Sequence, residues 1–116
     1  MQSAELIAVF TTVADDASAQ ALARAAISAR LAACVQVEPI HSVYTWEGQL
    51  QSGPEVRLMF KTTLPMYAEL ERFILDRHPY DLPAVYAVPV ALASPAYAQW
   101  VGQGVLLPGR PTPETP

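Results

Sequence analysis

Residues 77–90, RHPYDLPAVYAVPV, gather reactive side chains on a backbone stiffened by proline. His78 offers an imidazole, a common metal ligand, and Tyr80 and Asp81 add hydrogen-bonding groups beside it. The prolines around them fix backbone angles and push the residues before them towards extended conformations. The segment is therefore either a rigid loop that builds a site or a corner in which His78 accompanies a helix C-terminus or hydrogen-bonds a loop carbonyl. Tyr80 is equally compatible with an aromatic side chain at the edge of the core.

A second feature of chemical interest is the aromatic pair in the segment YTWEG, residues 44–48. Tyr44 and Trp46 are two residues apart, so on a strand their side chains point to the same face. Such a pair can form a ligand-stacking wall, but aromatic side chains are also enriched at protein interfaces. We favour the interface.

Three ionisable residues, Glu55, Arg57 and Lys61, are spaced so that they share one face of a predicted strand. In a chain with a single lysine, they form either a solvated face or the lining of a pocket. If subunits bury them they must pair, because an uncompensated buried charge is strongly destabilising.

The chain has few soft or imidazole metal ligands. A single cysteine, Cys34, excludes an intramolecular disulfide and any CxxC metal site. We interpret Cys34 first as a small buried hydrophobe, because no histidine lies near it in the sequence. Only folding can bring His41 or His78 close to it.

Composition limits the classes of protein that fit. Apolar residues make up 52% of the 116 residues and charged residues only 16%, where about a quarter is usual, so the chain either hides apolar surface in an oligomer or exposes it. A net charge of −4 without a basic stripe argues against nucleic acid, and no basic amphipathic segment indicates a membrane surface. The first 13 residues lack the basic region of a signal peptide. We expect a cytoplasmic protein.

Periodicity and turn residues predict a mixed order of strands and helices. Two of the predicted strands contain a proline, Pro39 and Pro89, which indicates an edge, a bulge or a bend. The predicted elements are a strand at 6–13, a helix for which Asp15, Asp16 and Ser18 offer caps and whose apolar stripe ends at Leu31, a strand at 33–46, a hairpin connection at 47–54, a strand at 55–63, a helix at 64–77, a strand at 84–92 and a short helix that Ser94 caps.

This βαββαβ order predicts a ferredoxin-like α+β sandwich with an extra C-terminal helix. The first two helices then cover one face of the sheet, and we expect another copy of the chain to cover the other face, since so apolar a strand set is rarely left bare. We predict one domain, residues 1–104, followed by a disordered proline-rich tail, residues 105–116.

Several motifs in this order resemble the CutA1 family, the divalent-cation tolerance proteins. The motifs are AACV (33–36), YTWEG (44–48), EVRLMFKTT (55–63), HPYDLP (78–83), VP (88–89) and YAQW (97–100). The likeness runs from residue 6 to residue 101. It implies a homotrimer with an architecture similar to that of PII signalling proteins, and a non-enzymatic role in the response to metal ions, copper above all.

The resemblance also implies a cleft between subunits where motif residues gather. On that basis, the candidates for the cleft are Tyr44, Trp46, Glu55, Arg57, Lys61, His78, Tyr80 and Trp100.

The chain departs from the family where metal is concerned. Some members have a cysteine, a histidine and a glutamate at the positions of Phe10, Arg77 and Ala84, and none of these three is a usual copper ligand. No cofactor is therefore firmly implied. Weak binding of copper or another divalent metal remains open, and its candidate ligands are His78, His41 and Cys34.

Other functions on the same fold make distinct demands. A PII-like sensor would bind a small anionic ligand in the cleft through Lys61 or Arg57. However, residues 11–20, TTVADDASAQ, contain no glycine for a phosphate-binding loop. An acylphosphatase-like hydrolase would need the same loop, a copper chaperone would need CxxC, and an RNA-recognition module would need basic charge.

Overall fold

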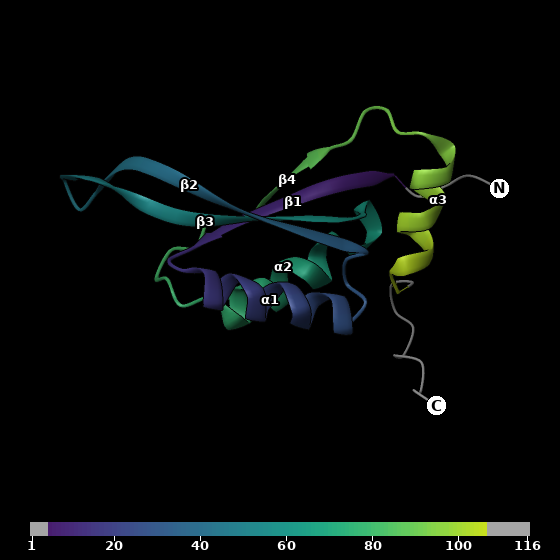
Figure 1. The fold of residues 1–116 in the computed structure, drawn as a ribbon, viewed down its shortest axis with the longest axis horizontal. Helices are drawn as coiled ribbons and strands as arrows, with labels where there is room; N and C mark the ends of the chain where they lie inside the picture. Colours follow the sequence, from purple (N-terminus) through teal and green to yellow (C-terminus); the bar gives the residue numbers. More distant parts are fainter. Residues whose placement is uncertain (1–4, 107–116) are drawn as a thin grey trace.

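Four antiparallel strands form one sheet, two helices pack on one of its faces, and a third helix stands across its end (Figure 1). The computed structural model describes residues 5–106. Its elements are β1 (Leu6–Val13), α1 (Asp16–Ser28), β2 (Cys34–Trp46), β3 (Gln49–Thr63), the 3-10 turn η1 (Leu64–Met66), α2 (Tyr67–Arg77), β4 (Tyr86–Pro89) and α3 (Pro95–Gly104). The strand order β2-β3-β1-β4 is that of the ferredoxin-like fold, so the predicted α+β class is confirmed.

Helix α1 begins where the sequence offers an N-cap. The Asp15 carboxylate accepts a hydrogen bond from the Ser18 backbone N–H at 2.7 Å. This bond satisfies a free donor at the helix start and lowers the pKa of Asp15. Small side chains then let the helix approach the sheet closely. The residues that α1 buries are Ala19, Leu22, Ala23 and Ala26.

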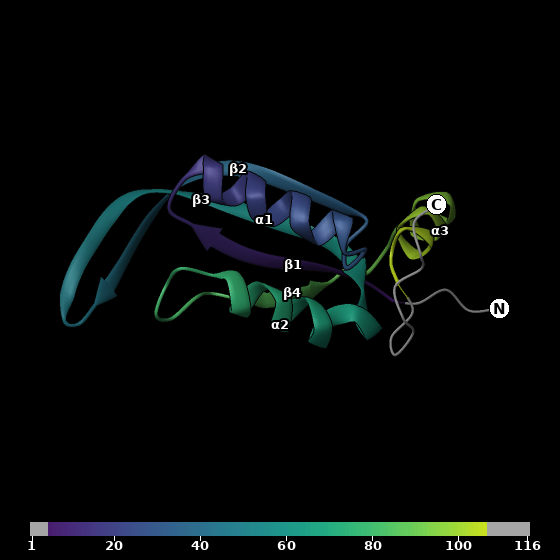
Figure 2. The ribbon, with the colours of Figure 1, turned by 90° about the horizontal axis from the view of Figure 1, so that it is seen from below.

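The core lies between the sheet and the helices α1 and α2 (Figure 2). Successive residues of a strand face opposite sides, so β1 and β3 each contribute every second residue to this layer. The stripe of Met66, Leu70 and Ile74 from η1 and α2 closes the core, as the helical spacing predicts. The central strand residues are Ile7, Val9, Val13, Leu58 and Phe60.

The connection between β2 and β3 is shorter than predicted. We expected a connection over residues 47–54, but only Glu47 and Gly48 form the turn, with φ of 52° and 76°. Two consecutive residues at positive φ make the tight two-residue turn that suits twisted strands. Trp46 therefore pairs with Gln49. The prediction took the later glycine and proline as loop residues and was wrong.

Strand β3 tolerates Gly53 and Pro54 because its first half has a neighbouring strand on one side only. β1 pairs with β3 from Val56 to Thr63, so residues 49–55 pair with β2 alone. A proline is tolerated at such an edge, where it need not donate to a neighbouring strand. Residues 40–55 thus form a two-stranded extension beyond the sheet, on the left of Figure 1, which we call the arm.

The fourth strand is also shorter than predicted, since β4 covers Tyr86–Pro89 rather than residues 84–92. The Val90 N–H donates to the Leu6 carbonyl at 3.0 Å. Leu6 is the first residue of β1, so among residues 5–106 β4 has no further strand residue to pair with beyond this point. Pro39 and Pro89 both lie on edge strands, which confirms what their missing N–H predicts.

Residues just beyond α3 belong to the folded part, which corrects the predicted boundary at residue 104. Val105 is buried in the core, and the Leu106 N–H donates to the Arg30 carbonyl at 2.9 Å. The Arg30 guanidinium in turn donates to the Gln103 carbonyl at 3.2 Å. The rest of the predicted tail, residues 107–116, lies outside the described residues.

Helix α3 buries only one of the three residues that its spacing places on one face. Val101 is fully buried, whereas Tyr97 and Trp100 stay 38% and 52% exposed. The two aromatic rings stack on each other with their centroids 5.9 Å apart. Part of the apolar surface of α3 is therefore left uncovered in a single chain.

Gly104 tests how closely α3 packs against the residues that lead into β2. A methyl group added there would lie 2.8 Å from Ala33 Cβ and 3.3 Å from Ala33 Cα. We expect Gly104→Ala to lower the free energy of unfolding by about 1–3 kcal/mol, since an overpacked contact must shift its neighbours. Chemical denaturation followed by circular dichroism measures the change.

The matched control is Gly102→Ala in the same helix, where no atom lies within 4 Å of an added methyl group. The higher helix propensity of alanine raises the free energy of unfolding there by about 1 kcal/mol or less. Equal denaturation midpoints for the two variants would contradict the close packing of α3.

Candidate functional site

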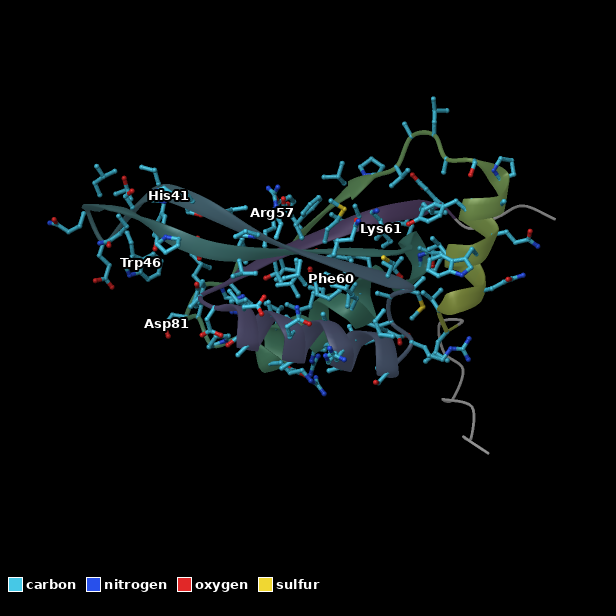
Figure 3. The ribbon with its side chains drawn as sticks, viewed as in Figure 1. His41, Trp46, Arg57, Phe60, Lys61 and Asp81 are labelled. Carbon is cyan, nitrogen blue, oxygen red and sulfur yellow. The ribbon has the colours of Figure 1, made fainter. Side chains whose placement is uncertain are left out.

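A hollow of about 560 Å³ lies between the base of the arm and the loop that joins α2 to β4. The arm contributes one wall and the loop contributes the other, and Figure 3 shows Trp46 and Asp81 on these two sides. Its lining residues are Thr12, Tyr44, Trp46, Glu55, Pro79, Tyr80, Asp81, Leu82 and Ala84.

Tyr44 and Trp46 reach the hollow from one face of β2, as their spacing predicts. Across the arm they pair with Gln51 and Gln49, which are polar and exposed. The two aromatic side chains are 48% and 42% exposed. One face of the arm is therefore an aromatic wall that a single chain leaves open to solvent.

His78 fastens the loop to the end of β1. Its Nε2 lies 2.8 Å from the Thr12 carbonyl oxygen, and its Nδ1 accepts a hydrogen bond from the Tyr80 backbone N–H at 3.2 Å. Because the backbone N–H can only donate and the carbonyl can only accept, the geometry assigns the proton of the neutral ring to Nε2. Both ring nitrogens are thus engaged, and His78 has the structural role that its place beside a helix end allowed.

Tyr80 connects the loop to the arm. Its hydroxyl donates to Glu55 Oε2 at 2.8 Å, and its ring packs edge-on against the His78 ring with the centroids 4.8 Å apart. Partial burial of the phenol, together with the hydrogen bond to Glu55 and the negative charge of that carboxylate, raises the pKa of Tyr80 to about 12. The hydroxyl therefore stays protonated and keeps Glu55 in place at neutral pH.

The hollow is acidic. Glu55 and Asp81 both line it, and its lining contains no lysine, arginine or histidine. Within residues 5–106 the ion pairs are Arg57 with Glu38 and Arg72 with Asp76, so neither carboxylate of the hollow is neutralised by a cation. Its electrostatic character therefore favours a positively charged ligand.

Arg57 and Lys61 lie along the sheet away from the hollow (Figure 3). Arg57 Nη2 is 2.6 Å from Glu38 Oε1, and Lys61 Nζ donates to Gln36 Oε1 at 3.1 Å. The Lys61 ammonium also lies 5.9 Å from the centroid of the Tyr97 ring. The three ionisable residues of β3 share one face, as predicted, but each has a separate partner.

The structure brings together about half of the eight cleft candidates within one chain. Tyr44, Trp46, Glu55 and Tyr80 line the hollow, and His78 stands beside it. Arg57, Lys61 and Trp100 lie elsewhere in the chain.

The three candidate metal ligands do not meet. His41 is on the arm, with its Nε2 2.8 Å from Ser52 Oγ, and Cys34 is half-buried at the start of β2 opposite Lys61. Over the described range 5–106, no three His, Cys, Asp or Glu side chains are grouped so as to hold a metal ion.

Sequence reasoning missed several residues that the fold makes important. Leu82 and Thr12 line the hollow, and Gln36 and Glu38 are the partners of the cations on β3. The signal for Gln36 and Glu38 was the alternation of side chains along residues 33–46. It places both on the same face as Cys34. No local signal marks Thr12, whose carbonyl accepts the bond from His78 only after folding.

These features define an α+β protein of ferredoxin-like topology with a long β2–β3 arm and an acidic, aromatic hollow at the base of that arm. Residues 7–104 match the family described as CutA1 divalent ion tolerance protein. The chain belongs to the CutA1 family, and the resemblance drawn from its motifs is confirmed.

Relatives support this assignment over most of the chain. The divalent-cation tolerance protein CutA of Yersinia pestis (strain Pestoides F) is 38% identical over 101 residues, which are 86% of this chain and 85% of that protein. Protein CutA of Mus musculus is 39% identical over 97 residues. The match covers 83% of this chain but only 55% of the mouse protein, so the chain spans little more than half of that relative.

Solved structures agree with the fold. CutA from Synechococcus elongatus PCC7942 has a TM-score of 0.85 at 36% identity, covering 91% of this chain and 95% of that one. CutA1 from Oryza sativa has a TM-score of 0.86 at 34% identity, covering 90% and 96%. Separately, none of the helices within residues 5–106 has the length and apolar character needed to cross a membrane.

The bond between Tyr80 and Glu55 predicts an unusual phenol titration. We expect the phenolate absorbance of the protein, after subtraction of the Tyr80→Phe curve, to show a group with a pKa of about 12. Glu55→Gln should move this midpoint down towards the ordinary value of about 10. Because the folded protein holds this proton more tightly, the contribution of Tyr80 to stability is complete below pH ~10 and is lost as the pH rises further.

A difference curve centred near the ordinary tyrosine pKa in the parent protein would contradict the bond. A curve that stays high in Glu55→Gln would show that burial alone raises the pKa of Tyr80.

Proposed function

We propose that this chain is a cytoplasmic, non-enzymatic subunit of a homotrimer that takes part in the response to divalent metal ions, copper above all, with weak direct metal binding at most. The observation that carries the proposal is the match of residues 7–104 to the divalent ion tolerance family. A Thermus thermophilus relative that is 34% identical to this chain is named a divalent-cation tolerance protein, which supports the same function.

The arm supports the proposed assembly because it exposes apolar side chains on both of its faces. Tyr44 and Trp46 lie on one face, and Val43 and Leu50 lie on the other, 63% and 75% exposed. A two-stranded hairpin with water on both sides is marginally stable, and its free edges invite pairing with another chain. Neighbouring copies that pack on the arm would cover the face that carries Val43 and Leu50 and would border the hollow on the other face.

Apolar side chains are also uncovered far from the arm. They follow the edge strand β4 and continue through the loop before α3 into that helix. Together they expose a larger continuous apolar area than singly scattered surface residues do. These residues are Tyr86, Val88, Leu92, Tyr97 and Trp100. Two separate apolar regions suit a closed ring, in which each copy meets a neighbour on either side, and the family resemblance implies three copies.

The residues that line the hollow support a non-enzymatic role. Among residues 5–106, its lining includes no histidine, the most frequent acid–base catalyst, and no cysteine or lysine nucleophile. Tyr80 is a poor acid–base catalyst, because its pKa of about 12 is far from neutral pH. A binding role fits these residues better than catalysis.

The PII-like alternative receives no comparable support. It requires Lys61 or Arg57 to bind an anion, yet Arg57 is paired with Glu38 and Lys61 is bonded to Gln36. The hollow itself is acidic, which disfavours an anionic ligand in the same place.

Among the candidate metal ligands, His41 is the most available. It is exposed, and within residues 5–106 its ring has one hydrogen-bond partner, the Ser52 hydroxyl. His78 by contrast uses both ring nitrogens. Weak copper binding in this chain is therefore best assigned to His41.

The trimer predicts a mass in solution equal to three chains of 12.6 kDa, measured by light scattering after size exclusion. Leu50→Lys places a charge on an apolar face of the arm and should shift the mass towards that of one chain. The control is Ala68→Lys on the exposed side of α2, which should keep the mass of the parent protein. A single-chain mass for the parent protein at micromolar concentration would end the trimer proposal.

Copper tolerance tests the function itself. Cells that lack their own protein of this family are expected to grow in raised copper better with this chain than without it. Equal growth of the two strains over the whole copper range would contradict the proposed function.

Calorimetric titration of the purified protein with copper and zinc then separates direct from indirect action. We expect small heats that fall further in His41→Ala and do not change in His78→Gln, with circular dichroism confirming that both variants fold. A loss confined to the His78 variant would overturn the assignment to His41.

A further inference from the structure

We propose that the hollow at the base of the arm is a binding site for an alkylammonium ion. This inference deepens the proposed function, because it names a ligand class for the cleft, and it rests on that function for the copies that surround the hollow. The walls themselves come from one chain.

The rings in the hollow provide the first reason. Tyr44, Trp46 and Tyr80 all line it, and the face of an aromatic ring attracts a cation through its quadrupole, most strongly for tryptophan. Groups of such rings are the usual recognition surface for ammonium groups that carry alkyl substituents, because these ions are weakly hydrated.

The carboxylates provide the second reason. Glu55 and Asp81 also line the hollow, and neither belongs to an ion pair within residues 5–106. Tyr80 occupies only Oε2 of Glu55, so the other carboxylate oxygen can accept a hydrogen bond from an N–H donor. An ammonium ion would therefore find a negative potential, and an ion that carries an N–H would also find a hydrogen-bond acceptor.

The shape and the apolar part of the lining favour an organic ion over a bare metal ion. A volume of about 560 Å³ lies within the range of small-molecule sites, roughly 300–1,000 Å³. Pro79, Leu82 and Ala84 supply apolar contacts for alkyl carbons. Calcium needs about six or more oxygen ligands, and residues 5–106 hold no group of three acidic or other metal-ligating side chains.

The loop is fixed before any ligand arrives. His78 fastens it to Thr12 of β1, and Tyr80 fastens it to Glu55 of β3. A site whose walls are already held in place loses less conformational entropy on binding. The ligand therefore does not have to order the loop.

The test is isothermal titration of the whole protein with tetramethylammonium chloride, at constant ionic strength. The neutral control ligand is tert-butanol, which has a similar size and shape but no charge. We expect saturable binding of tetramethylammonium and none of tert-butanol. Equal affinity for the two would show that the hollow selects apolar volume rather than charge, and would overturn the proposal.

Three variants locate the binding. Asp81→Asn and Glu55→Gln each remove one negative charge from the hollow, and we expect each to weaken binding at least tenfold. Asp81 is exposed, so its substitution is the less disruptive for folding. Glu69→Gln removes the same charge from the exposed side of α2 and should leave the affinity unchanged. Equal affinity in all three variants and the parent protein would overturn the assignment to the hollow.

Mass measurement on the same samples distinguishes this inference from the proposed function. A trimer that does not bind tetramethylammonium refutes the ligand class and leaves the assembly intact. A single chain that binds it with the expected dependence on Asp81 refutes the trimer and supports the site.

Discussion

The unequal lengths of the two central strands constrain the rest of the structure. β3 has 15 residues and β1 has 8, so residues 49–55 continue past the end of the sheet with β2 as their one neighbour. A hairpin of this kind buries neither face, and its apolar side chains remain exposed. The aromatic wall, the surface that a neighbouring copy could cover and the hollow at the arm's base all follow from this one difference in strand length.

The loop opposite the arm is held in place by hydrogen bonds between a histidine side chain and backbone groups. His78 lies where α2 ends, and the chain must turn there because Pro79 cannot continue the helix. By bonding Thr12 and Tyr80 at once, its ring ties the turn to the end of β1. A residue type suited to metals is thereby used for structure, and the chemistry of the hollow falls to its carboxylates and aromatic rings.

Features set by short sequence patterns could be predicted from the sequence. Features set by a segment distant in the sequence could not. Caps at Asp15 and Ser94, and the alternation that places Tyr44 and Trp46 on one face, are properties of short segments and were confirmed. The arm was missed because Pro54 is a turn signal locally, whereas the missing neighbour that makes it tolerable in a strand is set by where β1 ends. About half of the predicted cleft residues line the hollow. The sequence could not show which of them meet, because the loop and the arm come together only on folding.

Two positions show how this chain departs from the family pattern. Where the resemblance implies a cysteine in some members, the Phe10 ring stacks on Tyr86 with the centroids 5.3 Å apart, and where it implies a histidine, the Arg77 guanidinium lies 3.6 Å from the centre of the Phe73 ring. A soft-donor metal site at these positions would need those contacts to be given up. At the proposed ligand site, recognition of an organic cation would therefore rest on oxygen atoms and aromatic faces, which the acidic hollow supplies.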